Sequence, residues 1–264
     1  MIHAFRSEWL KIRRPAMILG GAGAMVGFAV LAIVLTLSRL GRAGGGPGGP
    51  GGVVVAAQVA ASDGFATLMG VSATFIGVIA LAVCAVAVGM EYANGTLRNL
   101  LVRQPGRLRL LAGKLLALGA FLALAVALAY GAALATALLL VSGHGISTAA
   151  WFSTDGVRSL LTTAGNLLLA TLAWGAIGAG LATVLRSTAV AIAGGLAYVL
   201  VVENLLVATW SGGAQWLPGQ LIDTIARGGT TAVSYTSALG LVGLYLLVAG
   251  VVAGALFQRR DVTA

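Results

Sequence analysis

Charged residues are scarce in this chain of 264 amino acids, of which only 9% are Asp, Glu, Lys or Arg. An ordinary soluble domain contains about 25% of these residues. With so few charges, a soluble protein of this length could not cover its surface. The shortage excludes a conventional cytosolic enzyme, a nucleic-acid-binding domain and a disordered chain, and it indicates that lipid is the solvent.

Cysteine and histidine are also scarce. Cys84 is the one cysteine, so no disulfide can form within the chain, and the redox compartment stays open. The two histidines, His3 and His144, stand in segments predicted on opposite sides of the membrane, whereas a metal site needs clustered His, Cys or carboxylate ligands. We therefore expect no metal and no cofactor.

Nucleotide-binding and catalytic motifs are missing as well. A Walker A loop needs a Gly-Lys pair followed by Ser or Thr, but here the Gly113-Lys114 pair is followed by Leu115. No serine stands on the strand–turn–helix elbow that would hold it in a catalytic triad. We expect this chain to have no enzymatic activity of its own.

Long apolar runs are what the sequence does contain, since 59% of its residues are hydrophobic. A helix needs roughly 17–25 apolar residues to cross a bilayer, and a spanning segment must be helical because lipid offers no partner for bare backbone amides. The sequence thus predicts an all-α polytopic membrane protein with six spans, at about Pro15–Leu37, Phe65–Met90, Leu115–Val141, Leu160–Leu185, Ala189–Ala208 and Ala238–Phe257.

The basic residues predict the orientation of these spans. Net charge is +9, and twelve of the 16 Lys and Arg residues fall on the side that carries both termini. Because basic loops stay in the cytoplasm, we expect both termini there, in a multi-pass protein of the cell membrane. The clusters lack interleaved aromatic residues, so we expect them to contact anionic lipid and no nucleic acid.

The segment 1–14 has the pattern of an amphipathic helix. Ile2, Phe5, Trp9 and Ile12 fall on one helical face. We expect an interface helix at the cytoplasmic surface, ending where Pro15 starts the first span. Its site residues are Phe5, Trp9, Arg13 and Arg14, and it either anchors the membrane edge alone or also helps to dock a cytoplasmic partner.

Two predicted outer segments are irregular. Residues 39–64 include the low-complexity run GRAGGGPGGPGG, which predicts a flexible linker. Residues 209–237 are too polar to span and predict short interfacial helices, in which Asp223 and Arg227 are spaced to pair at i, i+4.

The cytoplasmic loop at residues 91–114 is the most informative segment. Thr96 is a plausible N-cap after a turn at Gly95, and Leu97, Leu100 and Leu101 form a small apolar face at i, i+3, i+4. So short a helix is unstable alone, and packing or a partner must hold it. The alternative is an ordinary positively charged loop with a turn.

These residues resemble a known family. Residues 91–101 (EYANGTLRNLL) resemble the E-x-x-x-G-T-x-x-x-L-L stretch after the second helix of ABC transporter permeases of the type-2 exporter class. Residues 8–15 (EWLKIRRP) resemble the start of such permeases, and residues 257–263 (FQRRDVT) resemble their tail. Six spans with both ends inside fit the same layout, whereas the Gly/Pro-rich run departs from the usual first outer loop.

The resemblance implies a function. It makes residues 91–114 a coupling loop that touches separate cytoplasmic ABC ATPase subunits, and it implies a working unit of two permeases, identical or related, with two ATPases. The implied docking residues are Glu91, Gly95, Thr96, Leu97, Leu100, Leu101 and Arg103. ATP hydrolysis is then expected on the partner chain.

The fifth span contains the remaining polar candidates. Glu203 is 16 residues beyond Ser187, about 24 Å along a helix, so we expect it in the outer third of the bilayer, where an ionisable residue costs less than at the centre. Tyr198, Glu203 and Asn204 are candidates for lining a translocation path. The alternative is that Glu203 caps a helix or pairs locally, with Arg158 as the nearest candidate.

Taken together, these features predict a permease subunit of an ATP-driven ABC exporter that forms its path as a dimer. Two alternatives remain open. A secondary, ion-coupled carrier would need a mid-membrane carboxylate or broken helices with ion ligands, and an accessory membrane assembly protein would need neither. The substrate cannot be inferred from the sequence.

Overall fold

The fold is described from a computed structural model, which describes residues 2–40, 55–95, 107–210 and 212–259. Every regular element in these ranges is a helix. The first half contains α1 (Ile2–Ile12), α2 (Pro15–Met17), η1 (Ile18–Ala22), α3 (Gly23–Ser38), α4 (Ala56–Ala60), α5 (Gly64–Ala93) and α7 (Arg107–Gly143). The second half contains η2 (Ala149–Phe152), α8 (Thr154–Leu185), α9 (Thr188–Ala197), η3 (Tyr198–Val202), α10 (Glu203–Thr209), η4 (Gly213–Gln215), α11 (Pro218–Arg227) and α12 (Tyr235–Arg259).

Six helical stretches are long and apolar enough to cross a membrane. They are Pro15–Ser38, Ser72–Ala93, Arg109–Gly143, Thr154–Leu185, Thr188–Thr209 and Tyr235–Phe257. Each coincides with one of the six predicted spans, so the predicted fold class, an all-α polytopic membrane protein, is confirmed.

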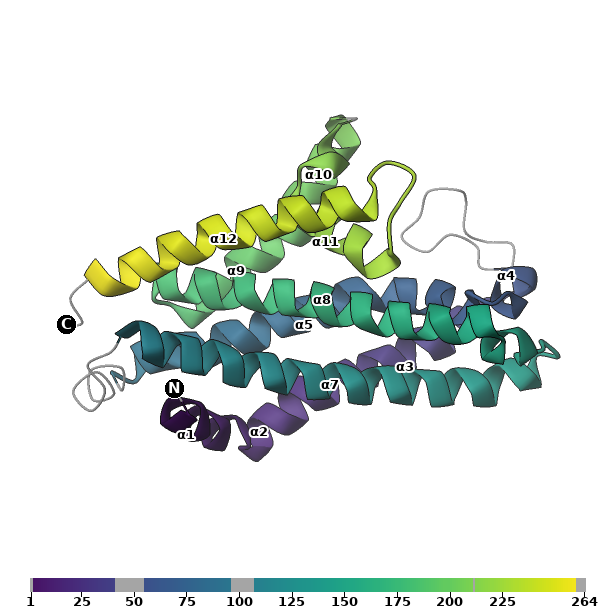
Figure 1. Cartoon of the computed structure of the whole chain (residues 1–264), viewed down its shortest axis with the longest axis horizontal. Helices are drawn as coiled ribbons and strands as arrows, with labels where there is room; N and C mark the ends of the chain where they lie inside the picture. The colour runs from purple at the N-terminus through teal and green to yellow at the C-terminus, as the bar shows by residue number, and fades with distance from the viewer. Residues whose placement is uncertain (1, 41–54, 96–106, 211, 260–264) are drawn as a thin grey trace.

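The centre of the molecule is the pair α5 and α8, which lie side by side over most of their length (Figure 1). Glycine permits this approach. A β-carbon at Gly178 of α8 would overlap the backbone carbonyl of Leu81 in α5, and one at Gly77 would overlap the indole of Trp174. Small residues at such contacts let membrane helices pack backbone to backbone. α3 and α7 complete the bundle against this pair.

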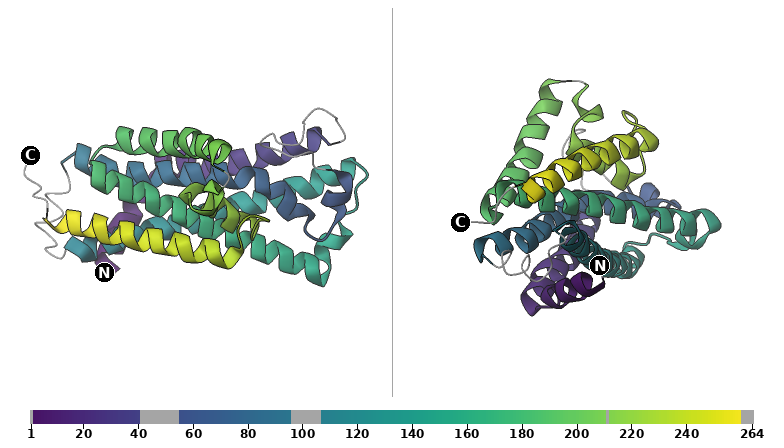
Figure 2. Two further views of the ribbon diagram at one scale, coloured as in Figure 1. Left: turned by 90° about the horizontal axis from the view of Figure 1, so that it is seen from above. Right: turned by 60° about the vertical axis from the view of Figure 1, so that its left-hand side comes forward.

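The last two spans diverge from the bundle. The continuous helix α9–η3–α10 leans away on one side and α12 runs along the other, with α11 between them (Figure 2). Both expose many large apolar side chains, including Val190 and Leu205 on the first and Leu247 and Val251 on the second. In a bilayer such surfaces contact lipid or another apolar chain.

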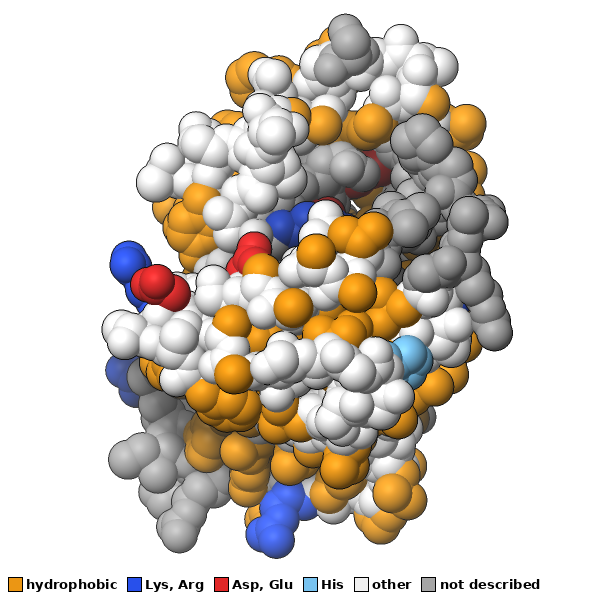
Figure 3. Space-filling view, turned by 90° about the vertical axis from the view of Figure 1, so that its right-hand side faces the viewer, with side chains coloured by type: hydrophobic (Ala, Val, Ile, Leu, Met, Phe, Trp, Pro, Cys, Tyr) orange, Lys and Arg blue, Asp and Glu red, His pale blue; other side chains and the backbone are white. Residues whose placement is uncertain are grey.

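Both chain ends lie at the same end of the bundle (Figure 1), which we call the terminal end. Among the described residues, the opposite, distal end shows scattered charged side chains among hydrophobic and uncharged ones (Figure 3). There the indole N–H of Trp151, a fully buried residue of η2, donates a 2.8 Å hydrogen bond to the carbonyl of Val59 in α4. This bond ties the short segments before α5 and α8 together.

Candidate functional site

The predicted coupling loop joins α5 to α7 at the terminal end. Glu91 lies in the last turn of α5, which ends through Asn94 and Gly95, and Gly95 has the left-handed φ of 61° that favours glycine after a helix. α7 begins at Arg107. The other predicted docking residues lie outside the described residues: Thr96, Leu97, Leu100, Leu101 and Arg103.

Four charged side chains meet at the base of this loop, and we call them the charge cluster: Glu8, Lys11, Glu91 and Lys114. The Lys11 ammonium lies 2.6 Å from Glu8 Oε1 and 2.9 Å from Glu91 Oε1. The Lys114 ammonium lies 3.0 Å from Glu8 Oε2 and 2.5 Å from Glu91 Oε1. Each cation thus bridges both carboxylates, and α1 is joined to the end of α5 and to the first turns of α7.

The charge cluster is largely removed from solvent. The side chains of Glu8 and Lys114 are only 3% and 6% exposed, whereas that of Lys11 is 38% exposed. Buried charges are tolerated when they are paired and hydrogen-bonded. Here two carboxylates face two ammonium groups, and Lys114 also donates to the backbone carbonyl of Ala87 at 3.4 Å.

The pKa values of two members reflect this pairing. Burial by itself would raise the pKa of Glu8, but the charge of Lys114 and the hydrogen bonds from both lysines outweigh it, so the pKa lies below its ordinary value. Burial would likewise lower the pKa of Lys11, but its bonds to Glu8 and Glu91 raise it above the ordinary value. Both groups are therefore held in their charged forms.

Sequence reasoning found only one member of the charge cluster, Glu91. It placed Glu8 in the amphipathic segment and counted Lys11 and Lys114 as topology signals. The signal that could have indicated the other members is the rarity of acidic residues, since only seven Asp and Glu occur in the chain. Three of the seven, Glu8, Glu91 and Asp261, lie with Lys or Arg in segments predicted at the cytoplasmic surface, and the first two belong to the charge cluster.

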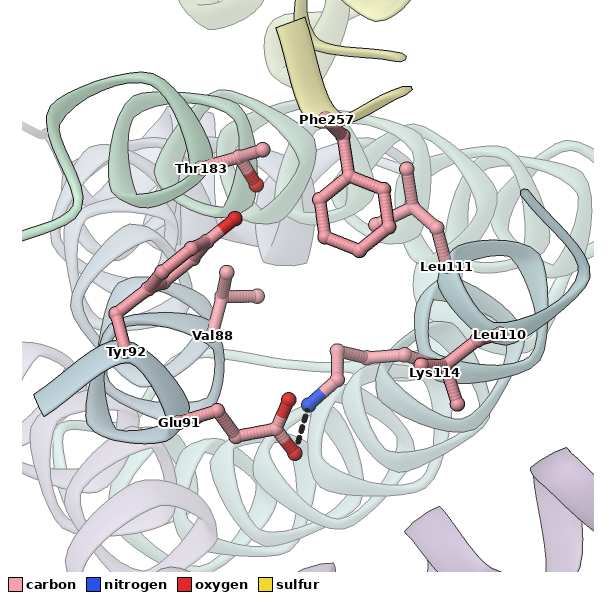
Figure 4. Close-up of a pocket in the computed structure, with 8 residues that line it drawn as sticks. All are labelled: Val88, Glu91, Tyr92, Leu110, Leu111, Lys114, Thr183 and Phe257. Atoms are coloured by element: carbon pink, nitrogen blue, oxygen red, sulfur yellow. Dashed lines mark ion pairs between the residues drawn. The ribbon is translucent and has the colours of Figure 1, made fainter. Parts of the chain in front are cut away.

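A small hollow lies beside the charge cluster, and the end of α12 forms part of its lining. Glu91 and Lys114 form one side of it, with their ion pair drawn in Figure 4. Tyr92 and Phe257 point into the hollow from α5 and α12. The last turn of α12 therefore lies beside the charge cluster that α1 also contacts. The spans α5, α7, α8 and α12 meet α1 at this end of the bundle.

The predicted interface helix is present as α1, which is followed by a bend at Arg14 and by Pro15 as the first residue of α2. The rings of Phe5 and Trp9 stack with centroids 5.9 Å apart. Both rings are half-buried against the bundle, whereas Arg13 and Arg14 are exposed. Glu8 also faces inward, so α1 buries a carboxylate together with its apolar stripe.

The fifth-span candidates lie at a different place, in η3 and in the first turn of α10. Glu203 is fully buried, and its two carboxylate oxygens accept hydrogen bonds from the backbone N–H groups of Gly219 and Gln220 at 2.8 and 3.1 Å. The carboxylate therefore caps the first turn of α11, which is the local alternative that the sequence left open. Its role on a translocation path stays a prediction.

A cavity of about 460 Å³ lies beneath this cap. Its floor is α8 with Leu81 of α5, its walls are α9–η3 and α12, and Pro218 and Ile222 of α11 border its distal edge. Tyr198, another predicted path residue, lines the wall. Asn204 does not line the cavity: its amide donates to the backbone carbonyls of Val199 and Leu200 at 3.2 and 3.1 Å.

Comparison with known proteins identifies the family. Residues 4–204 match the family described as ABC-2 family transporter protein, so the chain belongs to this family. It is a multi-pass membrane protein and a permease subunit of an ABC transporter, a class that works with ABC ATPase subunits. No match was found among the curated proteins searched.

Proposed function

We propose that this chain is the membrane-spanning subunit of an ATP-driven exporter of the cell membrane, and that cytoplasmic ATPases drive it through the loop between α5 and α7. The working unit contains two permeases, either two copies of this chain or one copy with a related permease. The chain itself hydrolyses no ATP. Both termini, and with them the charge cluster, face the cytoplasm.

The observation that carries this proposal is the position of the charge cluster at both ends of the loop. Glu91 lies just before the loop and Lys114 lies one to two turns into the helix that follows it, and their atoms are 2.5 Å apart. Glu8 and Lys11 fasten α1 to the same two residues. A force applied to the loop therefore reaches α5, α7 and α1 together.

This arrangement accounts for coupling without a nucleotide site in the chain. When the ATPase dimer closes on ATP, it displaces the loop, and the two loop-bearing helices tilt as a unit with α1. Two permease copies then exchange between conformations open to either side. A ligand shifts such an equilibrium only through its differential affinity for the two states, and here ATP supplies that difference through the partner.

The same structure argues against an ion-coupled carrier. Such a carrier needs a carboxylate or broken helix free to bind the coupling ion within the membrane. Glu203 is the acidic residue within the fifth described span, and both of its oxygens are engaged by α11. An accessory assembly role predicts no ATPase partner, and the experiment below distinguishes it.

The test replaces the predicted docking face of the loop. In the chain co-expressed with its ATPase, Leu97→Asp and Leu100→Asp place a charge on the apolar face. Both should abolish co-purification of the ATPase in mild detergent while membrane insertion remains. Mass spectrometry identifies the co-eluting chains, and ATP hydrolysis of the purified complex gives a second readout.

Asn99→Asp is the matched control, because it adds the same charge to the same short segment away from the leucines. This variant should retain its partner. If Leu97→Asp and Leu100→Asp keep the ATPase and its turnover at the level of Asn99→Asp, the loop is not the docking element. Wild-type chain that elutes without any Walker-bearing partner would favour the accessory role.

A further inference from the structure

We propose that Glu203 is a positioning residue that latches α11 over the distal edge of the cavity, and that release of this latch opens the cavity toward the distal side. Its place in a transport cycle rests on the proposed function, but the latch itself is a property of this chain. The inference concerns the distal edge of the cavity and leaves open what fills it.

The contacts of the latch are specific. α11 begins with Pro218, which has no backbone N–H, so the amides of Gly219 and Gln220 are the first that α11 can offer. Glu203 reaches both of them from α10, a separate helix. Both amides lie at the positive end of α11, which favours a hydrogen-bond acceptor there.

Position 219 is shaped for this carboxylate. A β-carbon there would overlap Glu203 Oε2 and would lie 3.1 Å from Oε1. Any larger residue would therefore push the carboxylate off the amides or push α11 away. Glycine at this position permits the close approach of backbone to carboxylate.

A bend-prone segment directly precedes Glu203. Residues Tyr198–Val202 form a π-helical turn, η3, inside an otherwise α-helical span. Asn204 supports this turn by donating to the carbonyls of Val199 and Leu200. Such turns occur often at functional sites. Because each residue advances an α-helix by about 100°, a change of this turn to regular α-helix would swing Glu203 away from α11.

The middle of α11 is held independently of Glu203. Thr74 of α5 donates a 2.9 Å hydrogen bond to Asp223, the sixth residue of α11. When the hydrogen bonds to Glu203 break, the first turn of α11 can move about this contact. Pro218 and Ile222 border the cavity at the released end, so their displacement uncovers it.

The experiment measures access to the cavity by cysteine labelling. Cys84 is replaced by Ala, and Ile177→Cys places the reporter on α8, in the floor of the cavity. The full chain, co-expressed with its ATPase, is labelled in right-side-out vesicles and in inverted vesicles with a membrane-impermeant maleimide, without ATP. From the distal side, Gly219→Ala and Glu203→Gln should each raise the labelling rate about tenfold, the change expected for loss of a hydrogen bond between the two helices.

Gly194→Ala is the matched control, because Gly194 lines the same cavity and a β-carbon there meets nothing within 4 Å. It should label at the parent rate. Equal rates for Gly194→Ala, Gly219→Ala and Glu203→Gln would overturn the latch. So would a rise that occurs only from the terminal side.

A double substitution separates the latch from general damage. With Glu203→Ala already present, Gly219→Ala has no carboxylate to displace, so the double variant should label at the rate of Glu203→Ala alone. A further increase in the double variant would show that Gly219 acts through something else, and would overturn the latch. Because no ATP or docking is read out, these results stand apart from the loop experiment, and either proposal can fail without the other.

Discussion

At the scale of single residues, two buried carboxylates show two ways of holding a charge inside this protein. Glu8 is neutralised by two ammonium groups at the terminal end, whereas Glu203 is satisfied by the main-chain amides at the start of α11. The first arrangement joins three helices through side chains. The second joins two helices through one side chain and the start of a helix.

Removing one cation of the charge cluster should be costly. Lys114→Met leaves Glu8 and Glu91 buried with only the half-exposed Lys11 between them. Breaking a buried pair by removing one partner destabilises a protein by about 3–5 kcal/mol. The measurement is the thermal unfolding midpoint of the purified chain in detergent, which should fall clearly below that of the wild type.

Arg13→Met is the control for this substitution. It also removes one positive charge, but the Arg13 side chain is exposed, so the midpoint should change little. Combining Lys114→Met with Glu91→Gln removes one charge of each sign and should recover part of the loss. If Lys114→Met and Arg13→Met unfold at the same temperature, the charge cluster does not stabilise the fold.

The charge cluster should also give stability a defined dependence on pH. The pKa of Glu8 is lowered on folding, so its contribution is present above its ordinary value of 4.5 and is lost as pH falls through the lowered value. The pKa of Lys11 is raised, so its contribution is present below 10.5 and is lost as pH rises through the raised value.

Glu8→Gln should therefore flatten the acid side of the stability profile, measured as unfolding midpoint against pH. Asp63→Asn is the comparison, because Asp63 is exposed and makes no capping hydrogen bond; it should keep the wild-type slope. An acid slope in Glu8→Gln as steep as that of the wild type would contradict the role assigned to Glu8.

At the scale of elements, glycines set the distance between α5 and α8. Gly178→Ala would drive a methyl group into the backbone of Leu81, and overpacking of this kind typically costs about 1–3 kcal/mol. We expect a lower unfolding midpoint. Gly180→Ala, two residues further along α8, meets nothing within 4 Å and should be neutral or slightly stabilising. Equal stability of the two variants would show that this contact does not set the helix spacing.

At the scale of the whole molecule, the division of labour between chains can be measured directly. The chain purified alone should show no ATP hydrolysis, and the complex with its ATPase should show turnover. Native mass spectrometry of that complex should find two permeases and two ATPases. Turnover by the isolated chain, or transport against a gradient without the partner, would contradict the proposed function.

The sequence by itself determined the fold class and the number and approximate positions of the spans, although three of their starts differ by six or seven residues in the structure. Each apolar run needs no tertiary partner to become a helix, because lipid leaves the backbone no alternative. The amphipathic pattern of α1 and the i, i+4 pair of Asp223 and Arg227 are also local, and both are present in the structure. Family membership followed from short motifs at similarly local spacing.

Only the tertiary structure decided which charges meet. Glu8 and Glu91 are 83 residues apart, and nothing in local periodicity brings either of them to Lys114. The cap of Glu203 on α11 depends likewise on the chain turning back into the bundle after the fifth span. Periodicity reports which face of a helix is apolar, but it carries no information about which helices become neighbours. The charge cluster and the Glu203 cap are both formed by residues from different helices, so only the tertiary structure could reveal them.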